Sequence, residues 1–116
     1  MKKSYVFLAE GFEEMEALAV VDILRRAGMP VETVSVTHDK NVTGSHGITV
    51  VADSMIGEVA RYADAEWLVL PGGMPGMTNL AACDTLCHLL KVHAEEGKPT
   101  AAICASPSVL GKLGLL

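Results

Sequence analysis

The sequence has few aromatic residues, few cysteines and no cluster of basic side chains. Aromatic residues make up 4% of the 116 residues, although half of the chain is hydrophobic. Lys and Arg number 9 against 14 Asp and Glu, which gives a formal net charge of −5. Nucleic-acid binding needs a basic surface that neutralises phosphates, so we expect no nucleic-acid partner. The composition is typical of one compact domain rather than of a disordered chain.

Signals for a membrane or a secretory pathway are also missing. No apolar run reaches the roughly 20 residues that a transmembrane helix needs. The first residues, MKKSYVFLAEGFEE, turn acidic too early for a signal peptide. The three cysteines, Cys83, Cys87 and Cys104, are an odd number without the spacing of a disulfide framework. We therefore expect no membrane partner and a location in the reducing cytoplasm.

Apolar patterns predict strands and helices that alternate along the chain. Four core strands are expected, at Tyr5–Ala9, Val31–Val36, Trp67–Leu70 and Thr100–Ile103. Helices are expected at Glu14–Ala27, Ile56–Tyr62, Met77–Cys83, Asp84–Glu96 and Ser106–Leu113. A short accessory strand at Ile48–Val51 is expected to form a hairpin with residues near Val42. This order predicts an α/β fold with a doubly wound, mostly parallel sheet.

The stretch Pro99–Gly111, PTAAICASPSVLG, predicts a sharp turn between a strand and a helix. Cys104 and Ala105 separate the apolar run from Ser106, a good N-cap residue, and from Pro107, which suits the first helical position. Such a turn exposes its residue beside helix-start N–H groups, as in a nucleophile elbow, here with cysteine in the nucleophile's place. Those N–H groups and the helix dipole favour a thiolate. A buried cysteine at a strand end is the alternative.

Two more loops are expected at the same sheet edge, because ligands of such folds bind at the carboxyl ends of the strands. In the loop Pro71–Gly76, Gly72 and Gly73 allow backbone N–H groups to approach a ligand closely, and with the N–H of Ala105 they could form an oxyanion hole. An ordinary glycine turn is the alternative. In the first loop, Glu16 lies on the apolar side, where an apolar pocket near the cysteine would keep its carboxyl protonated.

The remaining acidic, cysteine and histidine side chains are expected to be structural. Most acids near the first helix start, which also include Glu13 and Glu14, suit the positive end of the helix dipole. Cys83 and Cys87 are one helical turn apart, and we interpret them as packing residues rather than zinc ligands. His93 is expected on the surface. We therefore expect no metal site.

Three motifs together resemble the ThiJ/PfpI superfamily, and most closely its parkinsonism-associated protein deglycase branch. The motifs are AEGFEEMEA, VLPGGMPG and AAICASPSVL, and the resemblance covers essentially the whole chain in the same order. It implies a flavodoxin-like fold, similar to that of class I glutamine amidotransferases, and a homodimer. It also implies a nucleophilic Cys104, a buried acidic partner at Glu16, and an oxyanion-type glycine at Gly73 with Ala105 beside the cysteine.

The resemblance implies a function without a cofactor. Members are described as glyoxalase III-type enzymes that convert methylglyoxal to lactate, and as deglycases of proteins or nucleotides. The expected substrate is therefore a small aldehyde or a glycated molecule. The alternatives are an oxidative-stress sensor or chaperone that uses oxidation of Cys104 without turnover, and a peptidase or amidase. The superfamily name is also attached to thiazole monophosphate biosynthesis.

Two features depart from the family pattern. Ser106 stands where the family often has glycine, and the sequence stops at Leu116 although the family's domain continues and often carries a histidine there. We therefore expect residues 1–116 to be the N-terminal portion of a single domain, with apolar surface left bare and no cooperative folding in isolation. His46 lies where the family places a residue near the partner subunit's site. We favour a solvated loop histidine over that interface role.

Overall fold

The computed structural model describes residues 2–116, which form a central parallel sheet with strand order β5-β2-β1-β6-β7. The strands are β1 (Ser4–Leu8), β2 (Val31–Ser35), β5 (Ser54–Met55), β6 (Leu68–Leu70) and β7 (Thr100–Ala102). All four neighbouring pairs in this sheet run parallel. The α/β parallel-sheet fold predicted from the sequence is therefore confirmed.

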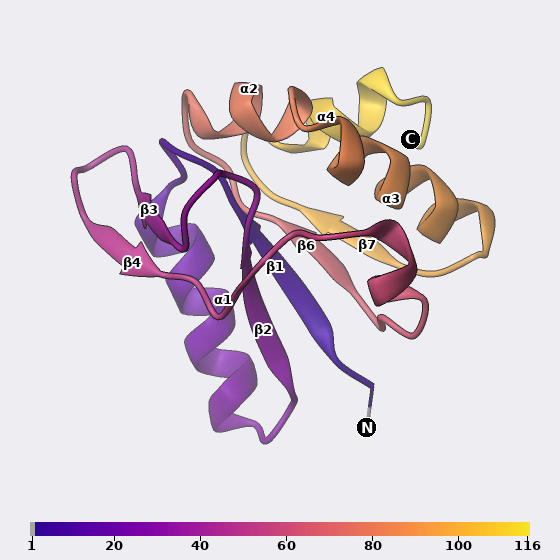
Figure 1. Cartoon of the computed structure of the whole chain (residues 1–116), viewed down its shortest axis with the longest axis horizontal. Helices are drawn as coiled ribbons and strands as arrows, with labels where there is room; N and C mark the ends of the chain where they lie inside the picture. Colours follow the sequence, from indigo (N-terminus) through magenta and orange to yellow (C-terminus); the bar gives the residue numbers. More distant parts are fainter. Residues whose placement is uncertain (1) are drawn as a thin grey trace.

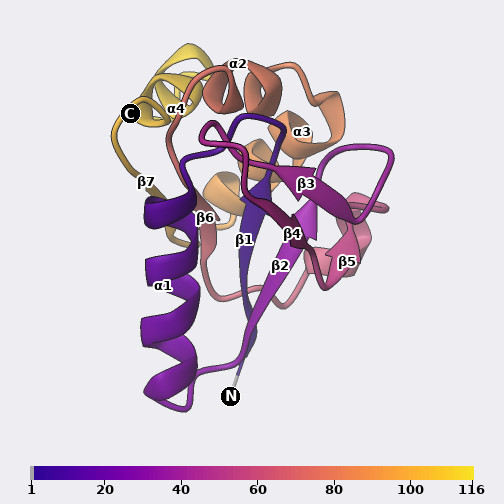
Figure 2. The same ribbon diagram turned by 90° about the vertical axis from the view of Figure 1, so that its left-hand side faces the viewer.

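Helices cover both faces of the sheet (Figures 1 and 2). Helix α1 (Glu14–Arg26) lies on one face, and α2 (Gly76–Ala81), α3 (Asp84–Glu95) and α4 (Pro107–Lys112) lie on the other. A short 3-10 helix, η1 (Val59–Tyr62), packs against α3. Among residues 2–116, no helix is both long enough and apolar enough to cross a membrane.

Strand β1 is buried on both faces, and its alternating side chains build two separate parts of the core. Tyr5 and Phe7 belong to the cluster beneath α2, α3 and α4, whereas Val6 and Leu8 belong to the cluster beneath α1. A strand covered on both sides needs a continuous apolar run rather than an apolar–polar alternation. The run predicted from the sequence as the first core strand has this pattern.

The prediction of a helix at Ile56–Tyr62 is wrong in its first half. Ser54–Met55 forms the fifth strand, β5, beside β2, and only Val59–Tyr62 is helical. Gly57 has a φ of 62°, a conformation that a right-handed helix excludes. A two-residue strand is too short to give a periodic apolar pattern, so the sequence did not indicate it.

The accessory hairpin is formed as predicted. Strands β3 (Asn41–Thr43) and β4 (Thr49–Val51) pair antiparallel, with Val42 opposite Val50. Val42 is fully buried in the cluster beneath α1. The hairpin therefore extends the α1 side of the core beyond the edge of the main sheet.

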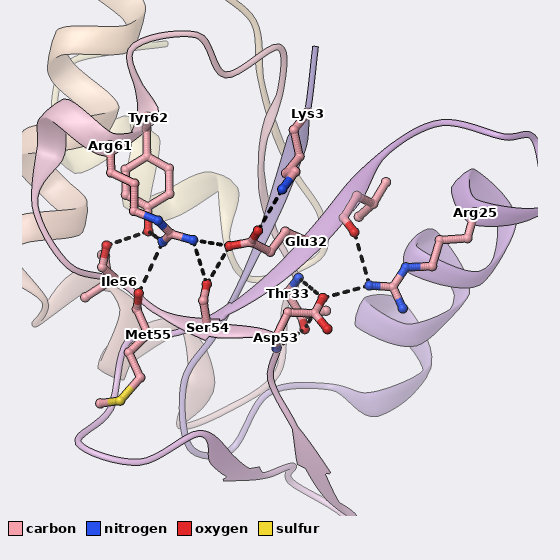
Figure 3. Close-up of polar contacts among 11 residues, drawn as sticks. Lys3, Arg25, Glu32, Thr33, Asp53, Ser54, Met55, Ile56, Arg61 and Tyr62 are labelled. Carbon is pink, nitrogen blue, oxygen red and sulfur yellow. Dashed lines mark hydrogen bonds and ion pairs between the residues drawn. The ribbon is translucent and has the colours of Figure 1, made fainter. Parts of the chain in front are cut away.

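A polar network fastens the edge strand β5 and helix η1 to the sheet (Figure 3). Glu32 on β2 accepts hydrogen bonds from Lys3 at 3.0 Å, from Ser54 at 2.5 Å and from Arg61. Arg61 also donates to Ser54 at 2.9 Å. The partly buried carboxylate of Glu32 thus binds the cations Lys3 and Arg61 from two other segments. These two cations compensate its negative charge, which is only partly solvated.

Tyr62 completes this network from the core side. Its hydroxyl donates to the carbonyl of Ile56 at 2.5 Å and accepts from Arg61 at 2.5 Å. The ring is 1% exposed and packs edge-on against the ring of Tyr5, with centroids 4.8 Å apart. Burial raises the pKa of Tyr62 to about 12, although Arg61 opposes this shift. The hydroxyl therefore keeps its proton and remains a donor at neutral pH.

The α1 face of the sheet is only partly covered. An apolar groove of about 280 Å³ lies between α1 and strands β6 and β7. Its lining includes Leu24, Val69, Trp67 and Ile103, of which Trp67 is 39% and Ile103 46% exposed. The apolar surface expected from the sequence is therefore present on this side of β6 and β7.

The prediction that His93 lies on the surface is wrong. His93 on α3 is 2% exposed, and its Nε2 lies 2.9 Å from the carbonyl oxygen of Pro99. Because a carbonyl can only accept, Nε2 carries the proton. Burial lowers the pKa of His93, and the hydrogen bond to Pro99 opposes that shift. A neutral histidine therefore ties α3 to the start of β7.

We expect Tyr62→Phe to lower the free energy of unfolding at neutral pH by about 0.5–1.5 kcal/mol, the usual net worth of one hydrogen bond, because the carbonyl of the partly buried Ile56 loses its donor. Wild-type stability should also fall as pH rises through about 10 to 12, since the folded state disfavours the Tyr62 phenolate. Phenylalanine cannot ionise, so the difference between the two proteins should narrow there. Urea unfolding of both proteins at neutral pH and at about pH 11 measures the difference in the free energy of unfolding. The same difference at both pH values would contradict the protonated, hydrogen-bonded Tyr62 hydroxyl.

Candidate functional site

The loops that follow β1, β6 and β7 meet at the carboxyl edge of the sheet, because these three strands are neighbours. Backbone hydrogen bonds join the first loop to the second. The N–H of Glu13 donates to the carbonyl of Gly72 at 2.9 Å, and the N–H of Gly76 donates to that of Gly11 at 3.1 Å. Hydrogen bonds therefore hold these loops together at the edge where ligands bind in open α/β sheets.

Cys104 occupies a tight turn between β7 and α4. Its φ is 59°, and it is the one non-glycine residue with a positive φ among residues 2–116. The N–H of Ser106 closes the turn by donating to the carbonyl of Ile103 at 3.0 Å, and the N–H of Ile103 donates to Leu70 at 3.2 Å. Such a conformation costs a non-glycine residue about 1–3 kcal/mol and persists only where the surroundings hold it. The side chain is exposed, as expected of a nucleophile elbow.

Gly72 is the point on which the two main candidate residues converge. A Cβ on Gly72 would lie 2.5 Å from Oε1 of Glu16 and 2.9 Å from Cβ of Cys104. Only the missing side chain lets both residues approach this backbone. The structure therefore brings Glu16 and Cys104, 88 positions apart in the sequence, to the same unfilled side-chain position of one glycine.

Glu16 is held in place by the same glycine. It lies in the first turn of α1 and is half-buried, and its Oε1 accepts the N–H of Gly72 at 2.9 Å. This hydrogen bond gives the Gly72 N–H a protein partner rather than directing it at a ligand. In the structure, Gly72 therefore positions the carboxyl of Glu16.

Gly73 and Ala105 flank this centre. Gly73 has a φ of 97°, and a Cβ there would lie 2.5 Å from N of Glu13 and 2.8 Å from the carbonyl oxygen of Gly11. Packing against the first loop thus requires glycine at this position. Ala105 directly follows Cys104, and its carbonyl accepts the Ser108 hydroxyl at 2.7 Å.

Ser106 does not act as the N-cap that the sequence suggested. It occupies the residue before α4, but its φ of −76° and ψ of −18° are helical and it makes no side-chain capping bond. Its hydroxyl instead donates to the carbonyl of Pro71 at 2.5 Å, and the residue is fully buried. Sequence patterns missed this contact because it joins loops 35 positions apart.

The other two cysteines differ from Cys104 in their surroundings. Cys83 and Cys87 are half-buried at and within the start of α3, and the Cys87 thiol lies 3.4 Å from the carbonyl oxygen of Ala81. Burial raises the pKa of Cys87, and the nearby Cys83 adds to this shift. Their surroundings are those of packing residues, as the sequence indicated.

Glu14 has a specific role that its sequence position did not reveal. It is 5% exposed, and it accepts hydrogen bonds from the N–H of His46 at 2.9 Å and from the N–H of Ile48 at 3.2 Å. The Nδ1 of His46 lies 3.1 Å from its other oxygen. His46 is an exposed loop residue, as expected, but it is paired with this carboxylate. Glu14 thus anchors the β3–β4 hairpin to α1.

The ligand atoms of Glu13, Glu14 and His46 lie within 4.8 Å of one another, which is near enough for a metal ion. Their hydrogen bonds already account for this approach. Glu13 accepts the N–H of Met15 at 3.2 Å as the N-cap of α1, and Glu14 holds the hairpin. We therefore interpret the cluster as part of the fold.

The sheet, its cysteine turn and the glycine loop beside it define a flavodoxin-like α/β protein with a thiol at the elbow. The sequence profile of the DJ-1/PfpI family matches residues 2–116, and the chain belongs to this family. The resemblance seen in the three motifs is thereby confirmed.

Three relatives illustrate the similarity. DJ-1 homolog A from Arabidopsis thaliana is 43% identical over 101 residues, which cover 87% of this chain and 26% of that protein. The Parkinson disease protein 7 homolog from Danio rerio is 33% identical over 109 residues, 94% of this chain and 58% of that protein. The structure of oxidized DJ-1 from Toxoplasma gondii has a TM-score of 0.92 at 39% identity, covering 100% of this chain and 63% of that one. The chain thus spans less than two thirds of these relatives' lengths.

We expect the Glu14 anchor to make stability depend on acidity. Burial disfavours its charged form, but hydrogen bonds from its own N–H, from His46 and from Ile48 outweigh this and lower the pKa of Glu14 from 4.5 to about 2. The stabilisation is therefore present above pH 4.5 and is lost as pH falls toward about 2. Glu14→Gln should be less stable than wild type at neutral pH, and the difference should close in acid.

Urea unfolding at neutral pH and at about pH 3 measures this closing difference. Glu58→Gln is the matched control, since Glu58 is exposed and makes no capping hydrogen bond at η1. The hydrogen bond to Glu14 raises the pKa of His46, helped by the charges of Glu13 and Glu14. Its contribution is present below pH 6.5 and fades at higher pH, so the two effects occupy different pH windows. If Glu14→Gln lowered the free energy of unfolding equally at both pH values, the charged Glu14 carboxylate would not be what anchors the hairpin.

Proposed function

We propose that the protein carries out cofactor-independent chemistry on methylglyoxal or its adducts, as a glyoxalase III- or deglycase-type enzyme. The observation that carries this proposal is the convergence of Cys104 and Glu16 on Gly72. An exposed thiol on a strained turn and a half-buried carboxyl, both next to the missing side chain of Gly72, supply a nucleophile and a proton carrier.

The proposed reaction begins with addition of the Cys104 thiolate to the aldehyde carbon of methylglyoxal. A carbon–sulfur bond forms, the carbonyl electron pair moves to oxygen, and a proton converts this oxyanion to a hemithioacetal. Glu16 then removes the proton from that carbon and returns a proton to the neighbouring carbon, which leaves a lactoyl thioester. Water hydrolyses the thioester and releases lactate and the thiol. The internal transfer of two electrons between adjacent carbons balances without an external oxidant or reductant.

The backbone beside Cys104 supports the charged steps. We assign the N–H groups of Gly73 and Ala105 as donors to the developing oxyanion, because both residues adjoin the centre defined by Gly72 and Cys104. Gly72 takes a different role, since its N–H already donates to Glu16. Deglycase activity would use the same thiolate on the hemithioacetal or aminocarbinol that methylglyoxal forms with thiols and amines.

We expect Glu16→Gln to reduce methylglyoxal turnover about 10²- to 10⁴-fold, the usual worth of general acid–base catalysis. Glutamine keeps a carbonyl oxygen to accept the Gly72 N–H, so the loop should remain in place. It cannot carry the proton. Lactate formation over time measures turnover, and alkylation of Cys104 by iodoacetamide measures the thiol separately.

Cys104→Ser should abolish lactate formation, whereas Cys83→Ser, a change at a half-buried packing cysteine, should leave it unchanged. Wild-type lactate formation by Glu16→Gln would remove Glu16 from the proton-transfer step. Wild-type turnover by Cys104→Ser would remove the thiol from the reaction altogether.

A second candidate function is an oxidative-stress sensor or chaperone that uses Cys104 without turnover. Exposure favours it: Cys104 is the exposed cysteine, while Cys83 and Cys87 are half-buried. The similar structure of DJ-1 from Toxoplasma gondii is that of an oxidized protein. Oxidation by peroxide would take the thiolate through sulfenate to sulfinate.

Brief peroxide treatment should therefore oxidise Cys104 to sulfinate before either other cysteine, because Cys104 is exposed, the other two are half-buried, and burial raises the pKa of Cys87. Peptide mapping by mass spectrometry at increasing times gives the order of oxidation. Equal oxidation of all three cysteines would argue against a special environment.

A peptidase or amidase reaction has less support. It would need a histidine as general base within hydrogen-bond reach of Cys104. Two of the four histidines have partners elsewhere, since His46 contacts Glu14 and His93 contacts Pro99. The proposed aldehyde reaction uses Glu16 in the role of proton carrier.

We propose a homodimer that uses the face formed by the start of α1 and the β3–β4 hairpin. A groove of about 750 Å³ lies there, and the exposed apolar side chains Met15, Leu18 and Ile48 line it. Contiguous exposed apolar surface of this kind marks protein interfaces.

With three free cysteines, the chain fits the reducing cytoplasm as its setting.

Light scattering at micromolar concentration should therefore give twice the chain mass of 12.2 kDa. Leu18→Arg should shift the protein toward one chain mass, because it places a charge in the apolar groove. Ile23→Arg is the matched control, since Ile23 is exposed on the same helix but does not line the groove. A single chain mass for wild type would exclude the dimer.

A further inference from the structure

One buried hydroxyl joins two of the three loops of the candidate site. Ser106 is fully buried, and its Oγ donates to the carbonyl oxygen of Pro71 at 2.5 Å. Pro71 is the residue that follows β6 and precedes Gly72. The hydroxyl therefore extends the pairing of β6 and β7 by one contact beyond the last residues of the two strands.

The carbonyl that Ser106 holds belongs to the same peptide group as the N–H that holds Glu16. The peptide unit between Pro71 and Gly72 consists of the Pro71 carbonyl and the Gly72 N–H, and this unit is planar and rigid. The Ser106 hydroxyl donates to one end of it, and Glu16 Oε1 accepts from the other end at 2.9 Å. Rotation of this peptide plane would break both contacts together.

Ser106 also closes the turn of Cys104. Its backbone N–H donates to the carbonyl of Ile103 at 3.0 Å across the residue whose φ is 59°. The same residue thus fixes the cysteine through its backbone and the Pro71–Gly72 peptide through its side chain. The position of Cys104 relative to Glu16 depends on both contacts.

We propose that Ser106 is a positioning residue, whose hydroxyl sets the orientation of the Pro71–Gly72 peptide and thereby holds Glu16 beside Cys104. The inference rests on the proposed function, in which these two side chains react together. Family resemblance does not supply this role, because the similar family often has glycine at this position. Ser106 acts through Glu16 and does not touch the substrate.

The test is a double-mutant cycle with Glu16. Ser106→Ala should lower kcat for methylglyoxal roughly ten- to a hundredfold, the cost of a misplaced reacting group, with KM changed by less than about twofold. In a Glu16→Gln background the same substitution should have almost no further effect on kcat, because the peptide then has no proton carrier to position. If Ser106→Ala lowered kcat by the same factor in the Glu16→Gln background as in wild type, the two residues would act independently and the proposal would be overturned.

Matched variants separate positioning from simple loss of stability. Ser108→Ala removes a hydroxyl at the same helix start that donates to Ala105 at 2.7 Å, and it should leave kcat unchanged. Ser106→Thr retains the hydroxyl and should restore most of kcat. Circular dichroism gives the folded fraction of each variant, and Ser106→Gly is a second variant without the hydroxyl if Ser106→Ala does not fold.

A readout without aldehyde keeps the proposal separate from the proposed function. The rate of Cys104 alkylation by iodoacetamide, measured against pH, should have the same profile in Ser106→Ala as in Glu16→Gln, and a different one in wild type. If wild type does not turn over methylglyoxal, the proposed reaction fails, and this profile still decides the role of Ser106. A wild-type profile in Ser106→Ala would show that the hydroxyl does not position Glu16 against Cys104.

Discussion

The parallel pairing of β1, β6 and β7 is the constraint on which the candidate site depends. β1 lies between β2 and β6, and β6 lies between β1 and β7, so three strands from distant parts of the chain end at one edge. β1 is buried along its whole length, which leaves it no freedom to shift its register without exposing apolar side chains. The helix start that carries Glu16 and the loops that carry Gly72 and Cys104 are therefore brought together by the core rather than by their own sequences.

Within this frame, the candidate site depends on the absence of a side chain at one position. Glu16 and Cys104 both approach the place that a Gly72 side chain would fill, and the Gly72 N–H orients the acid. The strained cysteine turn is held by backbone hydrogen bonds to Ile103 and Leu70. Strain at the reactive residue is thus supported by regular pairing of the neighbouring strands, a common arrangement in functional sites.

The sequence predicted those parts of the structure that leave a local pattern. The buried runs of β1 and β6 and the hairpin around Val42 followed from apolar periodicity and turn residues. β5 was not found, because two residues give no period and the Arg61–Glu32 contact beside it joins residues 29 positions apart. His93 was misplaced, because its contact with Pro99 exists only after α3 packs on β7.

The same distinction applies to the site. Cys104 was recognisable from the strand–turn–helix pattern around it, and Glu16 from its place on the apolar side of the first loop, with the family resemblance pointing to the same two residues. Ser106 and Glu14 were assigned local helix-start roles, yet each makes its decisive hydrogen bonds more than 30 positions away. Polar side chains that join loops across a fold leave no periodic signal, and only the folded chain shows their partners.

The Glu14 anchor also constrains how this protein can evolve. Its carboxyl group occupies the space where any side chain at Gly44 would lie. A larger residue at the hairpin tip therefore requires a shorter one at position 14, and a shorter one removes the acceptor of two hairpin N–H groups. A substitution at position 14 or position 44 alone would therefore disrupt the contact between the β3–β4 hairpin and α1. Across natural sequences of this type, helix start and hairpin tip should therefore exchange residues as a covarying pair.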